Sequence, residues 1–385
     1  MGDTGGPRER AQSRHRPWTE TILRLGLVLG FLYLFLVGVK ALETGISSFG
    51  NEFVDRVLES VANPIAGLAA GVLATVLVQS SSVTTATIVG LVGSGVLPVD
   101  VAVPMVMGAN IGTTVTNTLA SLGHMRRGVY FERAFAAATV HDYFNLIAVA
   151  ILLPFELAIG LISRIAMWIA DLIGDLLPDV GTGPSPVKSA IGAPVTWAAE
   201  TFESWGWGSA AGAVMLGAGI ALIFLALWAI TRQMRLVMSG RMENAINGIL
   251  SSGAGAGALI VGVVLTVAVQ SSSITTSILV PLVAAGVLTL ENAFPVTLGA
   301  NVGTTVTALL ASIAADSPDA LVIALAHVTF NVLGILIVYP FPRARSIPIR
   351  LAELTAAAAT RRHSLAAAYV FGLFIIAPVA ILLIA

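Results

Sequence analysis

Long apolar segments separated by short polar connections set the pattern of this chain. About 20 consecutive apolar residues are enough to cross the hydrocarbon of a bilayer, which is about 30 Å thick. The pattern therefore predicts membrane helices at 21–39, 101–121, 135–154, 209–230, 292–313, 321–339 and 365–384. Lys40 and Glu43 are predicted to close the first of these. Shorter apolar segments lie at 62–78, 83–97, 253–269 and 274–288.

Composition supports an integral membrane protein. The 385 residues are 56% hydrophobic and only 11% charged, whereas soluble proteins carry about 25% charged residues. A net charge of −1 excludes a nucleic-acid binder that works through a basic field. The chain has no cysteine, which excludes disulfides and thiolate chemistry. We expect a multi-pass protein of the plasma (inner) membrane, with residues 1–20 as a cytoplasmic N-terminal tail because no cleavage site follows them.

An internal repeat organises the chain. Residues 79–121 align with residues 270–312 at a constant offset of 191, and 25 of the 43 aligned positions are identical. Each copy begins with Gln-Ser-Ser-Ser and later contains Gly-Ala-Asn-x-Gly-Thr-Thr. Two copies of one unit indicate two structurally equivalent halves.

The charges of the connections predict how the halves are oriented. Arg126, Arg127 and Arg133 follow the first copy, whereas Asp316 and Asp319 follow the second. Cytoplasmic loops are enriched in Lys and Arg, so the equivalent loops lie on opposite sides of the membrane. A parallel duplication would break this charge rule at one loop. The loop charges therefore predict that the two halves form an inverted repeat, which is the architecture of secondary transporters.

The repeat also predicts a polar hairpin in each half. The apolar segment 83–97 has 15 residues and is too short to span. Polar backbone survives at membrane depth only when it is buried in protein or lines a cavity. We expect an all-α polytopic membrane protein with two inverted-topology repeats, each with a re-entrant helical hairpin, plus an extra C-terminal transmembrane helix. Its parts are a tail (1–20), a first repeat (21–154), an extracytoplasmic or interfacial linker (155–208), a second inverted repeat (209–341), and a cytoplasmic basic segment with the final helix (342–385).

The hairpin tips suit an anion accompanied by cations. A helix starts after each serine run, and its free N–H groups and positive dipole end attract an anion. No Lys or Arg lies within 57–125 or 242–342, so a buried anion there needs mobile cations. Neutral oxygen ligands in the Asn-x-Gly-Thr-Thr segments suit Na⁺. Gly108, Gly112, Gly299 and Gly303 allow either an unwound backbone or a close helix approach.

The doubled Gln-Ser-Ser-Ser run, each followed by Gly-Ala-Asn-x-Gly-Thr-Thr, resembles the type II sodium–phosphate cotransporter family over 62–145 and 253–331. The chain lacks the large cysteine-bearing extracellular loop of the animal members, so ion stoichiometry is not carried over. The resemblance assigns phosphate contact to the two polar runs: Gln79, Ser80, Ser81, Ser82, Gln270, Ser271, Ser272 and Ser273. Sodium contact is assigned, with overlap, to Gln270, Ser271, Thr276, Asn301, Thr304, Thr305, Asn110, Thr113 and Thr114.

Other polar residues have two interpretations. His-x-x-Phe-Asn occurs twice, at His141–Asn145 and His327–Asn331; these side chains either form a second shell around the site or join helices. Thr84, Thr85, Thr116 and Thr307 are likewise packing or site residues. Asp100 and Glu291 occupy equivalent positions at predicted helix starts; they are either ion ligands or helix N-caps, and we favour N-caps. Asp142 has no counterpart in the second half and receives no role.

The predicted function is sodium-coupled symport of inorganic phosphate by alternating access. The partners are phosphate, sodium ions and the lipid bilayer; Na⁺ is the co-transported ion, with no organic cofactor and no nucleic acid. The alternatives are a transporter of another oxyanion, a phosphate exporter, or a non-transporting membrane protein that regulates or scaffolds phosphate handling. An enzyme is not predicted, because no acid–base partner recurs beside the serines.

Overall fold

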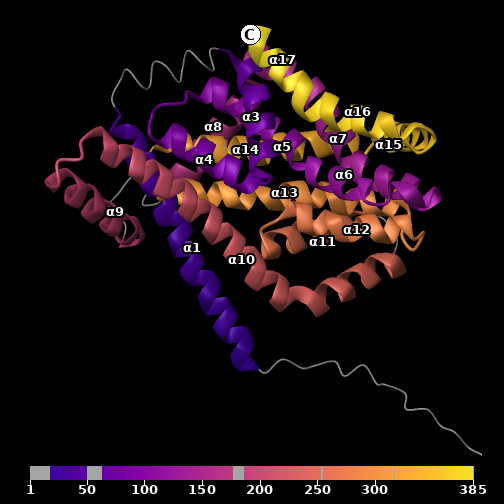
Figure 1. The fold of residues 1–385 in the computed structure, drawn as a ribbon, viewed down its shortest axis with the longest axis horizontal. Coiled ribbons are helices and arrows are strands. Elements are labelled where there is room, and N and C mark those ends of the chain that lie inside the picture. Colours follow the sequence, from indigo (N-terminus) through magenta and orange to yellow (C-terminus); the bar gives the residue numbers. More distant parts are fainter. Residues whose placement is uncertain (1–17, 50–62, 177–185, 253–254, 316, 385) are drawn as a thin grey trace, which may run out of the picture.

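The computed structural model describes residues 18–49, 63–176, 186–252, 255–315 and 317–384, and all regular elements in them are helices (Figure 1). The first half contains α1 (Trp18–Ser47), α3 (Pro64–Val78), α4 (Ser81–Gly93), α5 (Val99–Thr113), α6 (Val115–Leu122), η1 (Met125–Arg127), α7 (Val129–Ile159), α8 (Leu161–Leu176) and α9 (Pro186–Ser204). The second contains α10 (Ser209–Ser252), α11 (Ala256–Val269), α12 (Ser272–Ala284), α13 (Leu290–Ala314), α14 (Pro318–Val338), α15 (Pro342–Arg361), α16 (His363–Phe371), the π-helical η2 (Gly372–Ile376) and α17 (Ala377–Ile384).

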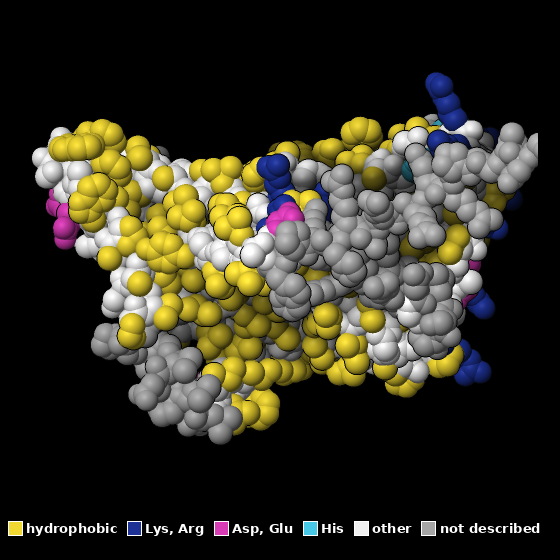
Figure 2. Space-filling model, turned by 90° about the horizontal axis from the view of Figure 1, so that it is seen from below, with side chains coloured by type: hydrophobic (Ala, Val, Ile, Leu, Met, Phe, Trp, Pro, Cys, Tyr) yellow, Lys and Arg dark blue, Asp and Glu magenta, His cyan; other side chains and the backbone are white. Residues whose placement is uncertain are grey.

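Six helical segments of the described chain are long and apolar enough to cross a membrane: Thr19–Ser47, Val129–Ile159, Ala210–Met238, Leu290–Ala314, Pro318–Val338 and His363–Ile384. Four shorter apolar helices, α3, α4, α11 and α12, have 13 to 15 residues. Figure 2 shows hydrophobic side chains over much of one face, with Lys and Arg mostly toward its right-hand end. The all-helical prediction is confirmed for the described residues.

The first span does not close where predicted. α1 continues past Lys40 and Glu43 to Ser47. The ammonium of Lys40 lies 3.2 Å from the carboxylate of Glu43, one helical turn further on. Because each charge compensates the other, both side chains are accommodated within a helix that continues through them. The predicted tail at 1–20 lies almost entirely outside the described residues.

Two predicted caps are wrong. Pro98, and not Asp100, is the N-cap residue of α5, and Asp100 lies in the first turn. At α13 the N-cap is Thr289, whose hydroxyl accepts from the backbone N–H of Asn292 at 3.3 Å. Glu291 lies in that first turn, where its charge still suits the positive helix end.

The predicted helix 101–121 is also wrong in one respect, because it is divided in two at Thr114. Its copy, α13, runs unbroken. Two side chains of α6 form hydrogen bonds to other helices. Asn117 donates to Thr276 of α12, and Thr118 donates to Asp142 of α7 at 3.2 Å. These bonds hold α6 against α12 and α7.

The predicted linker is largely helical where it is described. α8 and α9 occupy most of it, and Glu156 is buried within the protein. The carboxylate of Glu156 accepts from the backbone N–H groups of Ile162 at 2.6 Å and Ser163 at 3.2 Å. It therefore satisfies the free donors at the start of α8.

Glycines allow the closest helix pairs. An ideal Cβ on Gly108 of α5 would lie 2.0 Å from the carbonyl oxygen of Leu68 on α3. At the equivalent position, a Cβ on Gly299 of α13 would lie 2.0 Å from the carbonyl oxygen of Leu259 on α11. Both glycines lie within regular helix. Of the two interpretations of these residues, the structure therefore selects close helix approach.

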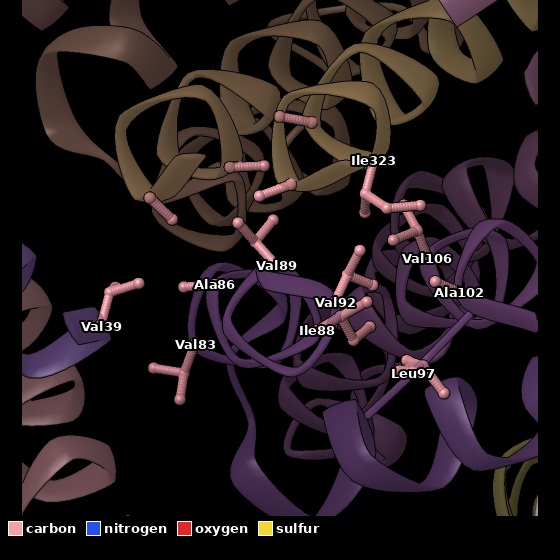
Figure 3. Packing of buried hydrophobic residues seen from close by; sticks show 14 of the residues in the cluster. Val39, Val83, Ala86, Ile88, Val89, Val92, Leu97, Ala102, Val106 and Ile323 are labelled. Atoms are coloured by element: carbon pink, nitrogen blue, oxygen red, sulfur yellow. The ribbon is translucent and has the colours of Figure 1, made fainter. Parts of the chain in front are cut away.

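The buried core fixes α4 in the middle of the molecule. Val92 of α4, Val106 of α5 and Ile323 of α14 lie near one another (Figure 3). Val83 and Val89, on the same helix, are also buried. This packing sets the position of the N-terminus of α4, where the first serine run lies.

Candidate functional site

The turn in each Gln-Ser-Ser-Ser run is made by its glutamine. Gln79 has φ 58° and Gln270 has φ 57°, and they are the only non-glycine residues of the described chain with positive φ. Each ends a helix, and its backbone N–H donates to the carbonyl of Thr75 or Thr266, at 2.8 and 2.6 Å respectively. A left-handed backbone at a residue with a Cβ is strained and is typical of functional segments.

Both glutamine side chains are held in the same way. The amide nitrogen of Gln79 donates to the carbonyl of Val76 at 2.6 Å, and that of Gln270 donates to Val267 at 2.7 Å. The amide oxygens accept from threonine hydroxyls, Gln79 from Thr116 at 3.0 Å and Gln270 from Thr307 at 2.9 Å. Thr116 and Thr307 thus orient the glutamines.

The first serine of each run starts the next helix. Ser80 is the N-cap of α4, and its hydroxyl accepts from the backbone N–H of Val83 at 3.3 Å. Ser271 caps α12 in the same way, accepting from Ile274 at 3.4 Å. The N-termini of α4 and α12, with their free N–H groups and positive dipole ends, therefore lie at the two runs.

The two runs share one cavity of about 240 Å³. It is lined by all eight residues predicted to contact phosphate: Gln79, Ser80, Ser81, Ser82, Gln270, Ser271, Ser272 and Ser273. Residues 191 positions apart in the sequence thus face the same space. The structure brings these side chains together; that they contact phosphate remains a prediction.

α10 forms another wall of this cavity. Phe224, Leu227, Trp228 and Thr231 line it, and sequence reasoning missed them. Their segment has the composition of an ordinary apolar membrane span, so its sequence contains no motif that would identify these residues as part of a site. The guanidinium of Arg232 lies 5.4 Å from the ring centroid of Trp228. This contact brings a fixed positive charge next to a residue of the cavity wall.

Contacts between the halves lie next to the cavity. The hydroxyl oxygens of Thr307 on α13 and Ser82 on α4 lie 3.4 Å apart, within hydrogen-bond distance. In the other direction, Asn117 of α6 donates to Thr276 of α12. Each hairpin is therefore joined by side-chain hydrogen bonds to the opposite half of the molecule.

The residues predicted to contact sodium are not brought together in this cavity. Of that set only Gln270 and Ser271 line it. The threonine hydroxyls bond to carbonyls of their own helix: Thr113 at 2.9 Å, Thr114 at 2.8 Å, Thr276 at 2.8 Å, Thr304 at 3.0 Å and Thr305 at 2.7 Å. A hydroxyl that donates in this way keeps its oxygen lone pairs for a cation.

Asn110 and Asn301 lie instead in a buried hydrogen-bond network. Asn301 accepts from His141 Nε2 at 2.5 Å and donates to Asn145 Oδ1 at 2.7 Å. Asn145 also donates to the carbonyl of Asn110 at 2.7 Å. In the other half, His327 Nε2 and Asn331 Nδ2 each lie 3.4 Å from Asn110 Oδ1. The His-x-x-Phe-Asn motifs thus bind the asparagines of the repeat and do not line the cavity.

Asp142 is a functional candidate that the sequence analysis left without a role. It is fully buried in α7. Its carboxylate accepts from the hydroxyl of Tyr369 at 2.9 Å and from that of Thr118 at 3.2 Å. Ionisable residues within membrane spans are functional by default, a signal that could have found it.

The six long apolar helices of the described chain, together with a cavity between two copies of one polar motif, are typical of a polytopic protein of the membrane-transporter class. The profile of the family described as Na⁺/Pi-cotransporter matches residues 34–172 and 222–348. The chain belongs to this family.

Two relatives illustrate the similarity. Sodium-dependent phosphate transport protein 2A of Rattus norvegicus is 32% identical over 426 residues, which cover 93% of this chain and 67% of the relative. Sodium-dependent phosphate transport protein 2B of Homo sapiens is 32% identical over 418 residues, which cover 86% of this chain and 60% of the relative. No solved structure shows a significant match.

Proposed function

We propose that this protein is a sodium-coupled symporter of inorganic phosphate, and not an enzyme. The observation that carries the proposal is the single cavity lined by both Gln-Ser-Ser-Ser runs. Two helix N-termini reach it, and backbone N–H groups with six serine hydroxyls suit the oxygens of an oxyanion. The relatives, which are named as sodium-dependent phosphate transport proteins, support the choice of phosphate and of sodium.

The cation requirement follows from the wall of the cavity. None of the described residues that line it is Lys, Arg or His. A bound phosphate would therefore have no cationic partner within the cavity wall, in a partly dehydrated space, which is costly. Sodium ions supply the missing charge, with Gln270 and Ser271 as ligands at the cavity. The proposal includes seven further sodium ligands, which do not line the cavity: Thr276, Asn301, Thr304, Thr305, Asn110, Thr113 and Thr114.

The proposed architecture is an inverted pair of repeats. α10 begins 191 residues after α1, which is the offset of the repeat. The two helices pack antiparallel, because Gly45 of α1 meets Leu216 while Leu42 meets Gly219 of α10. Equivalent helices that run in opposite directions support opposite topology of the halves. The boundaries at 155, 209 and 342 are part of the same proposal.

We include re-entrant hairpins in this proposal. α3, α4, α11 and α12 contain 13 to 15 residues, or about 20 Å of helix each, which is shorter than the hydrocarbon thickness. Each pair turns at a glutamine whose polar neighbours line the cavity. Hairpins that enter from opposite sides and meet at their tips account for both facts.

We propose alternating access as the mechanism of this arrangement. The cavity wall on α10 ends at Thr231, one residue before Arg232. Cytoplasmic ends are enriched in Lys and Arg, so we infer that the end with Arg232 and Arg235 is cytoplasmic, in a plasma membrane with the N-terminus inside. The cavity next to them therefore corresponds to the inward-facing state. Rocking of the halves would break the Thr307–Ser82 and Asn117–Thr276 contacts and expose the cavity on the other side.

Uptake of radiolabelled phosphate by proteoliposomes tests the proposal. An inward Na⁺ gradient should drive accumulation, and an equal K⁺ gradient should not. The double variant Gln79→Ala/Gln270→Ala should abolish uptake. Ser277→Ala is the matched control, since this exposed hydroxyl bonds only to the carbonyl of Ile274. Uptake that ignores the Na⁺ gradient would refute coupling, and preferential competition by sulfate would identify another oxyanion as the substrate.

A further inference from the structure

α15 is packed against the molecule by one face only. Ile349, Ala352 and Ala356 are buried against their neighbours, which include α7. The opposite face leaves two large apolar side chains in the open, Ile347 at 50% and Leu354 at 68% exposure. An exposed apolar stripe on a helix that is already packed requires a second environment.

Three arginines share that open face. Arg343, Arg350 and Arg361 are spaced by 7 and 11 residues, which are close to whole numbers of helical turns, and all three are exposed. No salt bridge joins any of them to another described residue. Glu353, also exposed, lies one turn from Arg350 and offsets part of this charge. The face therefore combines apolar side chains with net positive charge.

The connections of α15 place it at a membrane surface. It joins two candidate spans, Pro318–Val338 and His363–Ile384. If each of these crosses the bilayer once, both ends of α15 lie on the same side. Its 20 residues extend about 30 Å, and in Figure 1 it lies at the edge of the bundle beside α16. The arginines of α15 are too costly to bury in the hydrocarbon interior, and its exposed leucine is unfavourable in bulk water. A position at the membrane interface avoids both costs.

The equivalent helix of the first half has a different face. α8 directly follows α7, as α15 follows α14, and it packs against α14 while α15 packs against α7. Among the described residues of α8, the exposed charged side chains are Arg164 and Asp171, and their charges cancel. Trp168 on the same helix is 64% exposed. Two helices in equivalent positions thus have different charge. This difference fits two leaflets of different composition.

We propose that the open face of α15 binds the headgroups of anionic phospholipids, with Arg343, Arg350 and Arg361 contacting phosphate groups while Ile347 and Leu354 insert among the first acyl carbons. The positive charge selects an anionic lipid over a zwitterionic one. Each arginine near an anionic surface favours it by roughly fivefold. The proposal is independent of what the protein transports.

The absence of cysteine from the chain permits a direct test. Ala357→Cys places a single thiol on the open face, three residues after Leu354, for attachment of a fluorophore. The full-length protein is reconstituted with brominated phosphatidylglycerol or brominated phosphatidylcholine at equal mole fraction. We expect brominated phosphatidylglycerol to quench the probe about threefold or more strongly than brominated phosphatidylcholine. A probe at Met167→Cys, on the exposed face of α8, should show no such preference.

The triple variant R343Q/R350Q/R361Q should remove the preference for phosphatidylglycerol. The matched control R126Q/R127Q/R235Q removes three exposed positive charges elsewhere and should retain it; gel filtration checks that both variants stay folded. Equal quenching by the two lipids, or an equal loss in both triple variants, would overturn the proposal. Quenching by neither lipid would also overturn it, because the face would then lie in water and suit an acidic protein instead.

Discussion

His141 of α7 and Asn301 of α13 are joined by a buried hydrogen bond of 2.5 Å between Nε2 and Oδ1. The pair has a reciprocal partner, because His327 of α14 lies 3.4 Å from Asn110 of α5. The histidine of each half thus binds the asparagine of the other. Since Asn301 Oδ1 is an acceptor, His141 must hold its proton on Nε2.

This relationship predicts a loss of stability when Asn301 is truncated. Asn301→Ala leaves the Nε2–H of His141 and the Oδ1 of Asn145 without their partner in a buried site. Each unsatisfied group costs about 1–3 kcal/mol. We expect a clear drop in the melting temperature of the detergent-solubilised protein. Thr297→Val serves as control, because that hydroxyl bonds only within its own helix, and an equal drop in both variants would contradict the argument.

The glycine contacts predict a steric effect. Gly299→Ala would place a methyl group 2.0 Å from the carbonyl oxygen of Leu259, so α11 and α13 must separate. We expect a loss of about 3 kcal/mol of stability, in the upper range for an overpacked interior. Gly217→Ala in α10 meets nothing within 4 Å and should be tolerated. Thermal unfolding of both variants measures the difference; equal melting temperatures would show that the helices are not this close.

The contact between Ser82 and Thr307 predicts a cross-link that stops transport. Their hydroxyl oxygens lie 3.4 Å apart across the two halves. In the double variant Ser82→Cys/Thr307→Cys, oxidation should join α4 to α13, because the chain has no other thiol. Phosphate uptake should fall on oxidation and return on reduction, compared with the reduced variant as its own reference. Full uptake in a completely cross-linked protein would exclude movement between these two residues during the cycle.

The position of Arg232 leads us to predict that its positive charge strengthens the capture of phosphate. Its guanidinium lies against Trp228, which lines the cavity. Removal of one charge at the cavity rim is worth on the order of 1 kcal/mol in water. Arg232→Gln should therefore raise the half-saturating phosphate concentration about fivefold when phosphate is supplied on the side of the membrane where Arg232 lies. The effect should shrink as salt rises, because added ions screen the charge.

Arg235→Gln provides the comparison for this prediction. Arg235 is also exposed on α10, three residues further along, and it does not line the cavity. It carries the same charge, so its removal alters the general surface potential equally. A similar change in both variants, or a change in Arg232→Gln that is unaffected by salt, would show that Arg232 has no specific role at the cavity.

The amino-acid sequence alone was enough to predict the helical membrane fold and the two polar runs. Apolar length identifies spans because a bilayer accepts only segments of a fixed minimum length. The constant offset of 191 identified Gln79 and Gln270 as equivalent, and their positive φ angles show that they make equivalent turns. These properties are local, so they can be read from the chain.

Only the tertiary structure decided which residues meet. It placed the two runs in one cavity, added Trp228 and Arg232 of α10, and turned the histidine motifs toward Asn110 and Asn301. It also gave Asp142 a partner in Tyr369, 227 residues away. Such pairings depend on how helices pack across the chain. The periodicity of one helix defines its faces but does not specify which other helix each face will contact.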